Sequence, residues 1–220
     1  LKPAEYTPLT AMKLGEYALE AGLPEGVFNV LAGKGSIIGA RFVTHPQVRK
    51  IVFTGSTEVG KSIMAGCADQ VKRVTLELGG KSSNLIFADA DIAKAAAAAP
   101  GSFLDNAGQD CCARSRILIQ KSAFDSFMEH FEVAVKNFRV EDPSLASAEM
   151  GPLISRKQFD SVQTFLDEPV AFTGTAPTGS GYWMAPTVLL PKNTQARSWR
   201  EEVFGPVVSV MTFEDEAEGI

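Results

Sequence analysis

The stretch KIVFTGSTEVGKSIMAGCADQVKRVTLEL, residues 50–78, contains the pattern that decides the fold. Its apolar start at 50–53 predicts a buried strand, residues 56–68 predict a helix, and residues 71–78 predict a second strand. Strands and helices in alternation are typical of a parallel sheet, whose strands are buried on both faces. We therefore expect an α/β fold in which helices cover a parallel sheet.

The same alternation continues on both sides of this stretch. Helices are expected at 7–21, 36–42, 91–101, 123–139 and 155–166, and further strands at 27–31, 84–87, 115–120, 186–190 and 207–213. Pro100 is expected to bend or end its helix, because proline lacks the N–H that the helix requires. Residues 173–181, which are rich in Gly, Pro and Thr, are expected to form a loop.

The composition argues against several classes of function. The chain has 220 residues, a net charge of −5 and no cluster of Lys and Arg, so nucleic-acid binding is not expected. No apolar run is long enough to span a membrane. Three cysteines, two of them adjacent, do not form a disulfide framework and favour a reducing, cytoplasmic setting. Because residues 1–5 read like the interior of a fold, we expect the chain to be a piece of a longer protein.

The strongest chemical pattern is NAGQDCCA at 106–113. A cysteine that follows a glycine between a helix and a strand lies on a tight turn. Such a turn exposes the thiol and directs a backbone N–H toward an oxygen beside it, as acyl transfer or addition to an aldehyde requires. The alternative for a cysteine considered alone is a buried structural residue.

Two further patterns indicate a candidate general base and a candidate anion-binding site. In VTLELGGK, residues 74–81, Glu77 ends an apolar strand beside two glycines. Partial desolvation there would raise the pKa of its carboxyl group, as a general base requires, whereas the alternative is a solvated, ion-paired glutamate. In IVFTGSTEVG, residues 51–60, a strand leads into a glycine turn and a helix N-terminus, which is an anion site suited to a pyrophosphate. It lacks the G-x-G-x-x-G pattern, so a generic glycine turn is the alternative.

Together these segments resemble the aldehyde dehydrogenase superfamily, in its NAD-dependent, hydrolytic branch. The resemblance rests on five motifs in the family's order, and it covers essentially the whole chain. They are KPAE at 2–5, FTGST at 53–57, LELGGK at 76–81, GQDC at 108–111 and EEVFGP at 201–206.

The resemblance implies a role for each matching residue. It makes Cys111 the nucleophile and Glu77 the general base. It also implies that the NAD site contains Lys2, Glu5, Gly55, Ser56, Leu78, Glu202 and Phe204. A carboxylate at Glu5 would accept hydrogen bonds from the ribose hydroxyls and repel a 2′-phosphate, so NAD is expected rather than NADP.

The neighbours of the nucleophile are candidates for substrate contact. Asp110 borders the aldehyde tunnel in the family, so a cationic amino- or betaine-type aldehyde is one hypothesis, and an ion pair with Arg114 or Arg116 is the alternative. Cys112 lies beside the same site, and its simplest interpretation is a small packing residue. No group of His and Cys residues has metal-ligand spacing, so no metal site is predicted.

The resemblance also implies an organisation and a reaction. Residues 1–78 would be the later part of an NAD-binding domain and 79–220 an incomplete catalytic domain, with the active site at their junction. A small aldehyde would form a thiohemiacetal and then a thioester, which water activated by Glu77 hydrolyses to an acid. The alternatives are a coenzyme A-acylating member or a non-catalytic, truncated cofactor-binding relative. The parent protein is expected to be a homodimer or homotetramer, and an upstream Asn of the family's oxyanion hole and a C-terminal arm lie outside this chain.

Overall fold

The structure is a computed structural model that describes all 220 residues. They form two compact units, Leu1–Gly79 and Gly80–Ile220, and each is described by itself below. The predicted boundary between residues 78 and 79 lies one residue before this division, and the roles assigned to the two parts stay predictions. None of the helices combines the length and the apolar character that crossing a bilayer requires.

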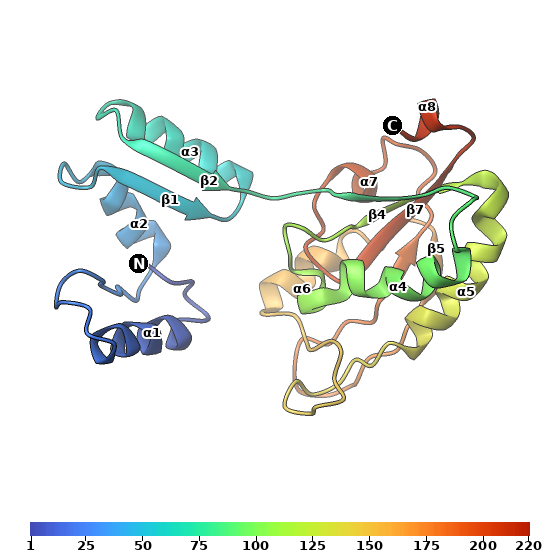
Figure 1. The fold of residues 1–220 in the computed structure, drawn as a ribbon, viewed down its shortest axis with the longest axis horizontal. Helices are drawn as coiled ribbons and strands as arrows, with labels where there is room; N and C mark the ends of the chain where they lie inside the picture. Colours follow the sequence, from blue (N-terminus) through green and yellow to red (C-terminus); the bar gives the residue numbers. More distant parts are fainter. The chain divides into compact units, whose positions relative to one another are not determined.

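The first unit contains three helices and a two-stranded sheet (Figure 1). Its elements are α1 (Leu9–Glu20), α2 (Gly35–Thr44), β1 (Lys50–Thr54), α3 (Thr57–Ala68) and β2 (Arg73–Glu77). β1 and β2 are parallel, from Lys50 opposite Arg73 to Thr54 opposite Glu77, which confirms the predicted strand–helix–strand unit. The prediction that the first strand is buried was wrong, because β1 alternates between exposed and half-buried positions and Val52 is 66% exposed.

The predicted strand at 27–31 is absent. The backbone hydrogen bonds that this segment makes beyond itself run from Val27 N to Pro24 O at 3.2 Å, from Leu31 N to Leu1 O at 2.9 Å and from the Leu1 amino group to Asn29 O at 2.6 Å. These bonds do not make a β ladder, which needs a row of alternating partners on a neighbouring strand. The prediction rested on apolar composition alone, and it was wrong because no strand of this unit pairs with residues 27–31.

The second unit is built on a five-stranded mixed sheet in the order β3-β4-β7-β6-β5. All neighbouring strands are parallel except β5 and β6, which are antiparallel. The predicted loop at 173–181 is therefore preceded by a strand, β5, that the sequence did not indicate. The elements of this unit are β3 (Ser83–Ile86), α4 (Ile92–Leu104), η1 (Asp105–Gly108), β4 (Arg116–Gln120), η2 (Lys121–Ala123), α5 (Phe124–Asn137), α6 (Arg156–Gln163), β5 (Val170–Thr173), β6 (Thr187–Leu189), α7 (Arg197–Arg200), β7 (Val207–Phe213) and α8 (Glu216–Gly219).

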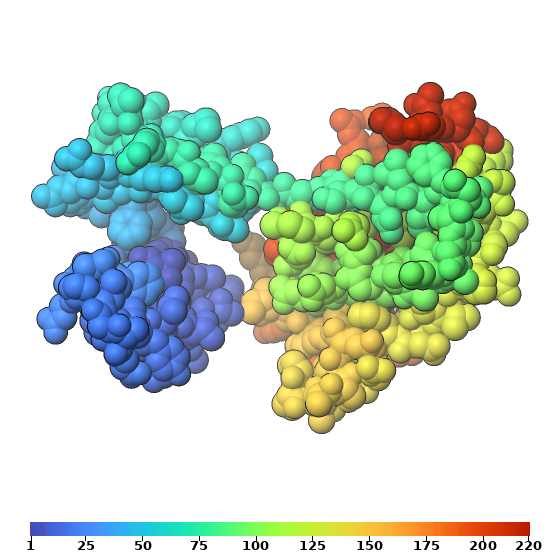
Figure 2. Space-filling model, viewed as in Figure 1, coloured from blue at the N-terminus to red at the C-terminus, as the bar shows by residue number.

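Most of the hydrophobic core lies in this second unit. Cys67 is the single buried hydrophobic residue of the first unit, whereas the others follow from Ile86 onward. α4 and α5 pack against each other, and the rings of Phe103 and Phe131 meet edge to face at 6.1 Å. Figure 2 shows the green segment that includes α4 on the visible face of this unit.

Pro100 was expected to bend or end its helix, and it does not end it. α4 continues through Pro100 to Leu104. Packing explains the continuation, since Ala96, Ala99 and Phe103 on this helix are almost completely buried. Burial of that face outweighs the missing backbone hydrogen bond of one proline.

Candidate active site

The turn that precedes Cys111 has an unusual backbone. Asn106, Ala107 and Gly108 are three consecutive residues in the left-handed region, with φ of 49°, 57° and 70°. This conformation costs about 1–2 kcal/mol for a residue with a Cβ. At Gly108 it is combined with a close approach, because a Cβ there would lie 2.1 Å from the carbonyl oxygen of Gly205. Only glycine fits this position, which explains why the cysteine motif contains a glycine at residue 108.

Side chains hold the same turn from both ends. The Asn106 Nδ2 donates to the Gln109 carbonyl at 3.0 Å, and the Gln109 Nε2 donates to the Asn106 carbonyl at 3.0 Å. The Gln109 Oε1 accepts the N–H of Ile154 at 3.0 Å, which ties the turn to the loop before α6. These hydrogen bonds therefore hold the backbone of the turn that precedes Cys111.

Cys111 lies on this turn with a partly exposed thiol, as the sequence predicted. Its Sγ is 3.9 Å from the Sγ of Cys112. The hydrogen bond with Cys112 and the charge of that group raise the pKa of the Cys111 thiol, and desolvation and the Asp110 carboxylate act in the same direction. The raised pKa favours the protonated form of the Cys111 thiol.

The two neighbours of Cys111 differ from expectation. Cys112 is exposed, so its interpretation as a packing residue was wrong. Asp110 forms no ion pair with Arg114 or Arg116; its Oδ1 accepts the N–H of Cys112 at 3.1 Å instead. A short turn satisfies this carboxylate locally, and the guanidinium of Arg116 lies over the Trp199 ring.

The second unit brings other residues of the predicted motifs close to Cys111. Gly80 N donates to the Glu202 Oε1 at 3.0 Å across 122 residues of sequence. A Cβ on Gly80 would lie 2.2 Å from the Cys111 carbonyl oxygen, so the second glycine of the LELGGK motif permits direct contact with the cysteine backbone. Phe204 has φ of 53° and is 37% exposed, which argues against ordinary core packing. Gln158 donates to its carbonyl at 2.7 Å.

The first unit gathers Lys2 and Glu5 around the start of α2. The Glu5 Oε1 accepts the N–H of Gly35, in the first turn of the helix, at 2.7 Å. The Lys2 ammonium donates to the carbonyls of Pro3 at 2.6 Å and Gly33 at 3.2 Å. These two predicted cofactor residues therefore meet at one place, positioned by a glycine segment that the sequence had not singled out.

Gly55, Ser56 and Leu78 lie at the carboxyl end of the β1–β2 pair, where ligands bind in parallel sheets. Ser56 is the N-cap of α3, and its Oγ accepts the N–H of Val59 at 3.3 Å. Gly55 N donates to the Glu77 carbonyl at 3.0 Å. A Cβ on Gly60 would lie 2.6 Å from Leu78, so the first turn of α3 packs directly on that side chain.

Glu77 ends β2, as the sequence predicted, but it is exposed. The expected desolvation was therefore wrong.

The comparisons with known proteins agree along the whole chain. Residues 1–220 match the model described as "Aldehyde dehydrogenase family". The chain belongs to the aldehyde dehydrogenase family. It is 41% identical to the peroxisomal aminoaldehyde dehydrogenase 2 of Pisum sativum and 40% identical to the chloroplastic betaine aldehyde dehydrogenase of Atriplex hortensis. All of this chain is covered in both, but 45% of each relative, so the chain spans about half the length of the curated relatives it matches.

Solved aldehyde dehydrogenases have the same fold. The structure matches a betaine aldehyde dehydrogenase of Staphylococcus aureus in complex with NAD+ with a TM-score of 0.93 and 39% identity, over 100% of this chain and 46% of that one. It matches an aldehyde dehydrogenase of Pseudomonas aeruginosa with a TM-score of 0.96 and 38% identity, over 100% and 46%.

Lys81 belongs to the LELGGK motif of this aldehyde dehydrogenase chain, but the sequence analysis assigned it no role. Burial, followed by the nearby Arg116 charge, lowers the pKa of the Lys81 ammonium to about 8, although Glu202 and Glu168 act in the opposite direction. Its Nζ makes no hydrogen bond within the protein. The Lys81 ammonium is thus buried near the Glu202 carboxylate, which accepts the N–H of Gly80. In the sequence, the position of Lys81 directly after two glycines is the only sign of this environment.

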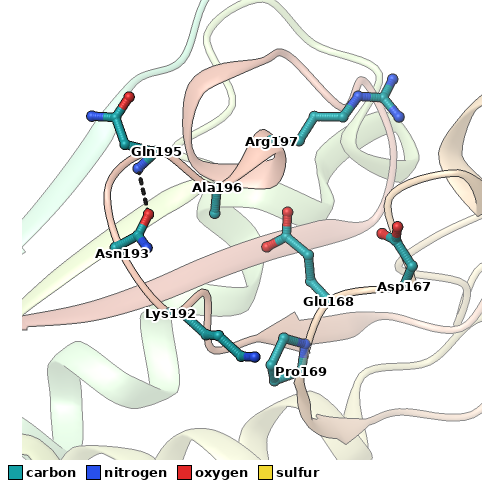
Figure 3. A pocket seen from close by; sticks show the side chains of 8 residues that line it. All are labelled: Asp167, Glu168, Pro169, Lys192, Asn193, Gln195, Ala196 and Arg197. Carbon is teal, nitrogen blue, oxygen red and sulfur yellow. Dashed lines mark hydrogen bonds between the residues drawn. The ribbon is translucent and has the colours of Figure 1, made fainter.

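A hollow in the second unit of the aldehyde dehydrogenase chain contains none of the predicted site residues. It has a volume of about 580 Å³ and lies between the start of β5 and the segment around α7 (Figure 3). The Glu168 carboxylate accepts hydrogen bonds from the N–H of Ser198 at 2.9 Å and from its hydroxyl at 2.5 Å. This carboxylate fixes α7 against β5, which is a structural role. The lining residues are Asp167, Glu168, Pro169, Lys192, Asn193, Gln195, Ala196 and Arg197.

Proposed function

We propose that the protein containing this chain oxidises an aldehyde to a carboxylic acid, with NAD as the hydride acceptor. The observation that carries the proposal is the glycine-dependent turn that presents the Cys111 thiol in a chain of this family. Because the chain spans about 45% of its relatives, the activity is proposed for the whole protein.

Cys111 is the nucleophile in this proposal. After its thiol loses a proton, the sulfur forms a bond to the aldehyde carbon, and the carbonyl oxygen becomes an alkoxide. The N–H of Cys111 donates to no protein acceptor, whereas the next two N–H groups, of Cys112 and Ala113, are occupied by Asp110. The free N–H is therefore available to the developing alkoxide, a contribution that is typically worth about 2.7–4 kcal/mol in such sites.

The chain offers groups that fit NAD in both units. In the first turn of α3 the N–H groups of Thr57 and Glu58 have no acceptor in the protein, so they can bind a pyrophosphate at the helix N-terminus. Lys2 and Glu5 would contact the adenosine ribose, Gly55, Ser56 and Leu78 would line the pyrophosphate region, and Glu202 and Phe204 would hold the nicotinamide end. A bound NAD supplies the acceptance of a hydride from the substrate carbon.

Glu77 is the proposed base for the last step. Its exposed carboxylate can take a proton from water, whose oxygen attacks the Cys111 thioester and releases the acid and the thiol. This favours hydrolysis over transfer to coenzyme A. Glu77→Gln should retain the burst of NADH and slow the steady state; loss of the burst would assign Glu77 to thiol activation instead. Products that require coenzyme A would contradict the hydrolytic branch.

The central experiment uses the full-length protein. With an aldehyde and NAD, we expect NADH and acid in equal amounts, no turnover for Cys111→Ala, and turnover well above that of Cys111→Ala for Cys112→Ala. Mass spectrometry after reaction with an electrophilic aldehyde analogue should find the adduct on Cys111. An adduct on Cys112, or a dead Cys112→Ala variant with active Cys111→Ala, would contradict the assignment.

A cationic aldehyde is the proposed substrate class. Asp110 lacks a cationic partner and stands directly before the nucleophile. Relatives of the chain include proteins named aminoaldehyde and betaine aldehyde dehydrogenase. A carboxylate about 6 Å from a substrate cation would stabilise it by about 1–2 kcal/mol at an intermediate dielectric.

The substrate proposal is tested with a pair of aldehydes of equal length, one cationic and one neutral. Asp110→Asn should lower kcat/KM for the cationic aldehyde about 5- to 30-fold, the factor that corresponds to 1–2 kcal/mol, and leave the neutral one near its original value. An equal change on both substrates would discard the electrostatic role.

We also propose a cytoplasmic location and a homodimer or homotetramer. Three free cysteines support a reducing compartment, although relatives carry peroxisomal, chloroplastic and mitochondrial names. Cell fractionation tests the location, and light scattering of the full-length protein tests the assembly. Secretion or a monomer would contradict them.

A further inference from the structure

Asp110, Cys111 and Cys112 form a compact group of metal-binding atoms. Their carboxylate oxygen and two sulfurs all lie within 4.8 Å of one another. The sequence predicts no metal site, because two adjacent cysteines differ from the spacings of known zinc motifs. The structure nevertheless directs both thiols to the same side of the turn.

The separation of the sulfurs suits a single metal ion. Two thiolates bound to tetrahedral Zn²⁺ at about 2.3 Å are about 3.8 Å apart. The observed Sγ–Sγ distance is 3.9 Å. The two sulfurs therefore need almost no rearrangement to share one ion.

The same distance argues against a disulfide between these cysteines. A disulfide requires the sulfurs to approach to about 2.05 Å and usually separates the Cα atoms by more than 4.4 Å. Adjacent residues joined by a trans peptide have Cα atoms about 3.8 Å apart. A metal bridge therefore requires less movement of the two sulfurs from their observed positions than a disulfide does.

Asp110 can complete a three-ligand set. Its Oδ1 accepts the N–H of Cys112, and no other hydrogen bond reaches this carboxylate, so Oδ2 is free. No salt bridge neutralises it. A carboxylate that is oriented through a backbone N–H resembles the supported ligands of stable metal sites.

We propose that Asp110, Cys111 and Cys112 bind one thiophilic divalent ion of the Zn²⁺ and Cd²⁺ class, with water in the fourth position. Binding converts two thiols to thiolates and releases two protons to solvent, with no change of oxidation state. The ion and its three anionic ligands carry a net charge of −1. Binding itself is independent of the proposed function; its consequence, reversible loss of the nucleophile, rests on that function.

The test titrates the full-length protein that contains this chain with Cd²⁺ after phosphine reduction and removal of metals, without NAD or aldehyde. We expect an ultraviolet thiolate-to-cadmium band that saturates at one ion per chain. Cys112→Ser should remove the high-affinity binding of this one Cd²⁺ ion. Asp110→Asn should weaken binding at least about tenfold, because even an outer partner of a metal ligand is typically worth 10- to 100-fold. Zn²⁺ should slow alkylation of Cys111, measured by peptide mapping.

Two variants serve as matched controls. Cys67→Ala removes the cysteine of the first unit, which is 1% exposed, and Asp105→Asn removes a nearby exposed acid; both should leave the titration unchanged. Circular dichroism verifies folding of each variant. A titration that Cys112→Ser does not alter, or the absence of a cadmium band, would overturn the site. If the band forms as expected and full-length protein shows no aldehyde oxidation, the proposed function fails while the metal site stands.

Discussion

At the residue scale, Glu5 is positioned to determine cofactor choice. One carboxylate oxygen accepts the Gly35 N–H, and the other makes no hydrogen bond within the chain. Glu5→Ser removes the negative charge that would face a 2′-phosphate, so NADP should bind more tightly relative to NAD. Fluorescence titration of the full-length protein with both cofactors measures the ratio. Glu20→Ser, at an exposed position of α1, is the control, and equal use of NAD and NADP by the unaltered protein would contradict the prediction.

Lys81 should make stability depend on pH. The pKa of its ammonium is about 8 in the folded chain against an ordinary 10.5. Between these values the unfolded chain binds the proton and the folded chain does not, so the free energy of unfolding rises with pH across this window. Below pH 8, burial of the Lys81 cation lowers the free energy of unfolding by a constant amount of at most about 3 kcal/mol.

Lys81→Met removes this titration. The variant should exceed the unaltered chain in stability at pH 7 and lose that advantage by pH 10, as followed by urea unfolding. An advantage that stays constant from pH 7 to pH 10 would show that Lys81 keeps an ordinary pKa. The sequence could place Cys111 on a turn and Glu77 at the end of a strand because their motifs are local. It could not find Lys81, because the lowered pKa of its ammonium comes first from burial and then from the charge of Arg116, and both depend on how the chain packs.

At the scale of elements, the left-handed turn before Cys111 gives a sharp stability prediction. Gly108→Ala would place a Cβ 2.1 Å from the Gly205 carbonyl oxygen at a φ of 70°. The left-handed conformation alone costs about 1–2 kcal/mol, and the backbone contact adds to it, so we expect a loss above 2 kcal/mol in urea unfolding.

Gly101→Ala is the matched control for this prediction. Gly101 lies in α4, and a Cβ there meets nothing within 4 Å. Alanine should stabilise the helix by about 0.5–1 kcal/mol. Comparable effects at the two glycines would mean that the turn does not need its left-handed backbone.

Elements were predictable where local pattern and packing agree. The strand at 207–213 and the strand–helix–strand unit follow from apolar patterns, and β1, α3, β2 and β7 confirm them. The helix was not ended at Pro100 because burial of one face keeps α4 continuous, whereas the segment 27–31 is no strand because it has no paired neighbour. β5 was missed because its identity depends on antiparallel pairing with β6.

At the scale of the whole molecule, the two units should differ in stability. Cys67 is the single buried hydrophobic residue of Leu1–Gly79, whereas the second unit contains the aromatic and aliphatic core. Apolar burial supplies most of the stability of a domain. We expect hydrogen exchange of this chain to show faster amide exchange in β1 and β2 than in β4 and β7. Equal protection of the two sheets would mean that they open as one cooperative unit.

The position of β7 has a consequence for synthesis on the ribosome. This strand is the last in the chain, yet it stands between β4 and β6 in the middle of the sheet. Until it emerges, β4 is paired only with β3, its edge toward β7 is open, and Glu202 has not yet reached Gly80. At bacterial and eukaryotic translation speeds, the residues between β4 and β7 take on the order of ten seconds to be added. For that interval the nascent chain carries Cys111 without Glu202, Phe204 and β7, so a reactive thiol and an unpaired strand edge coexist during synthesis.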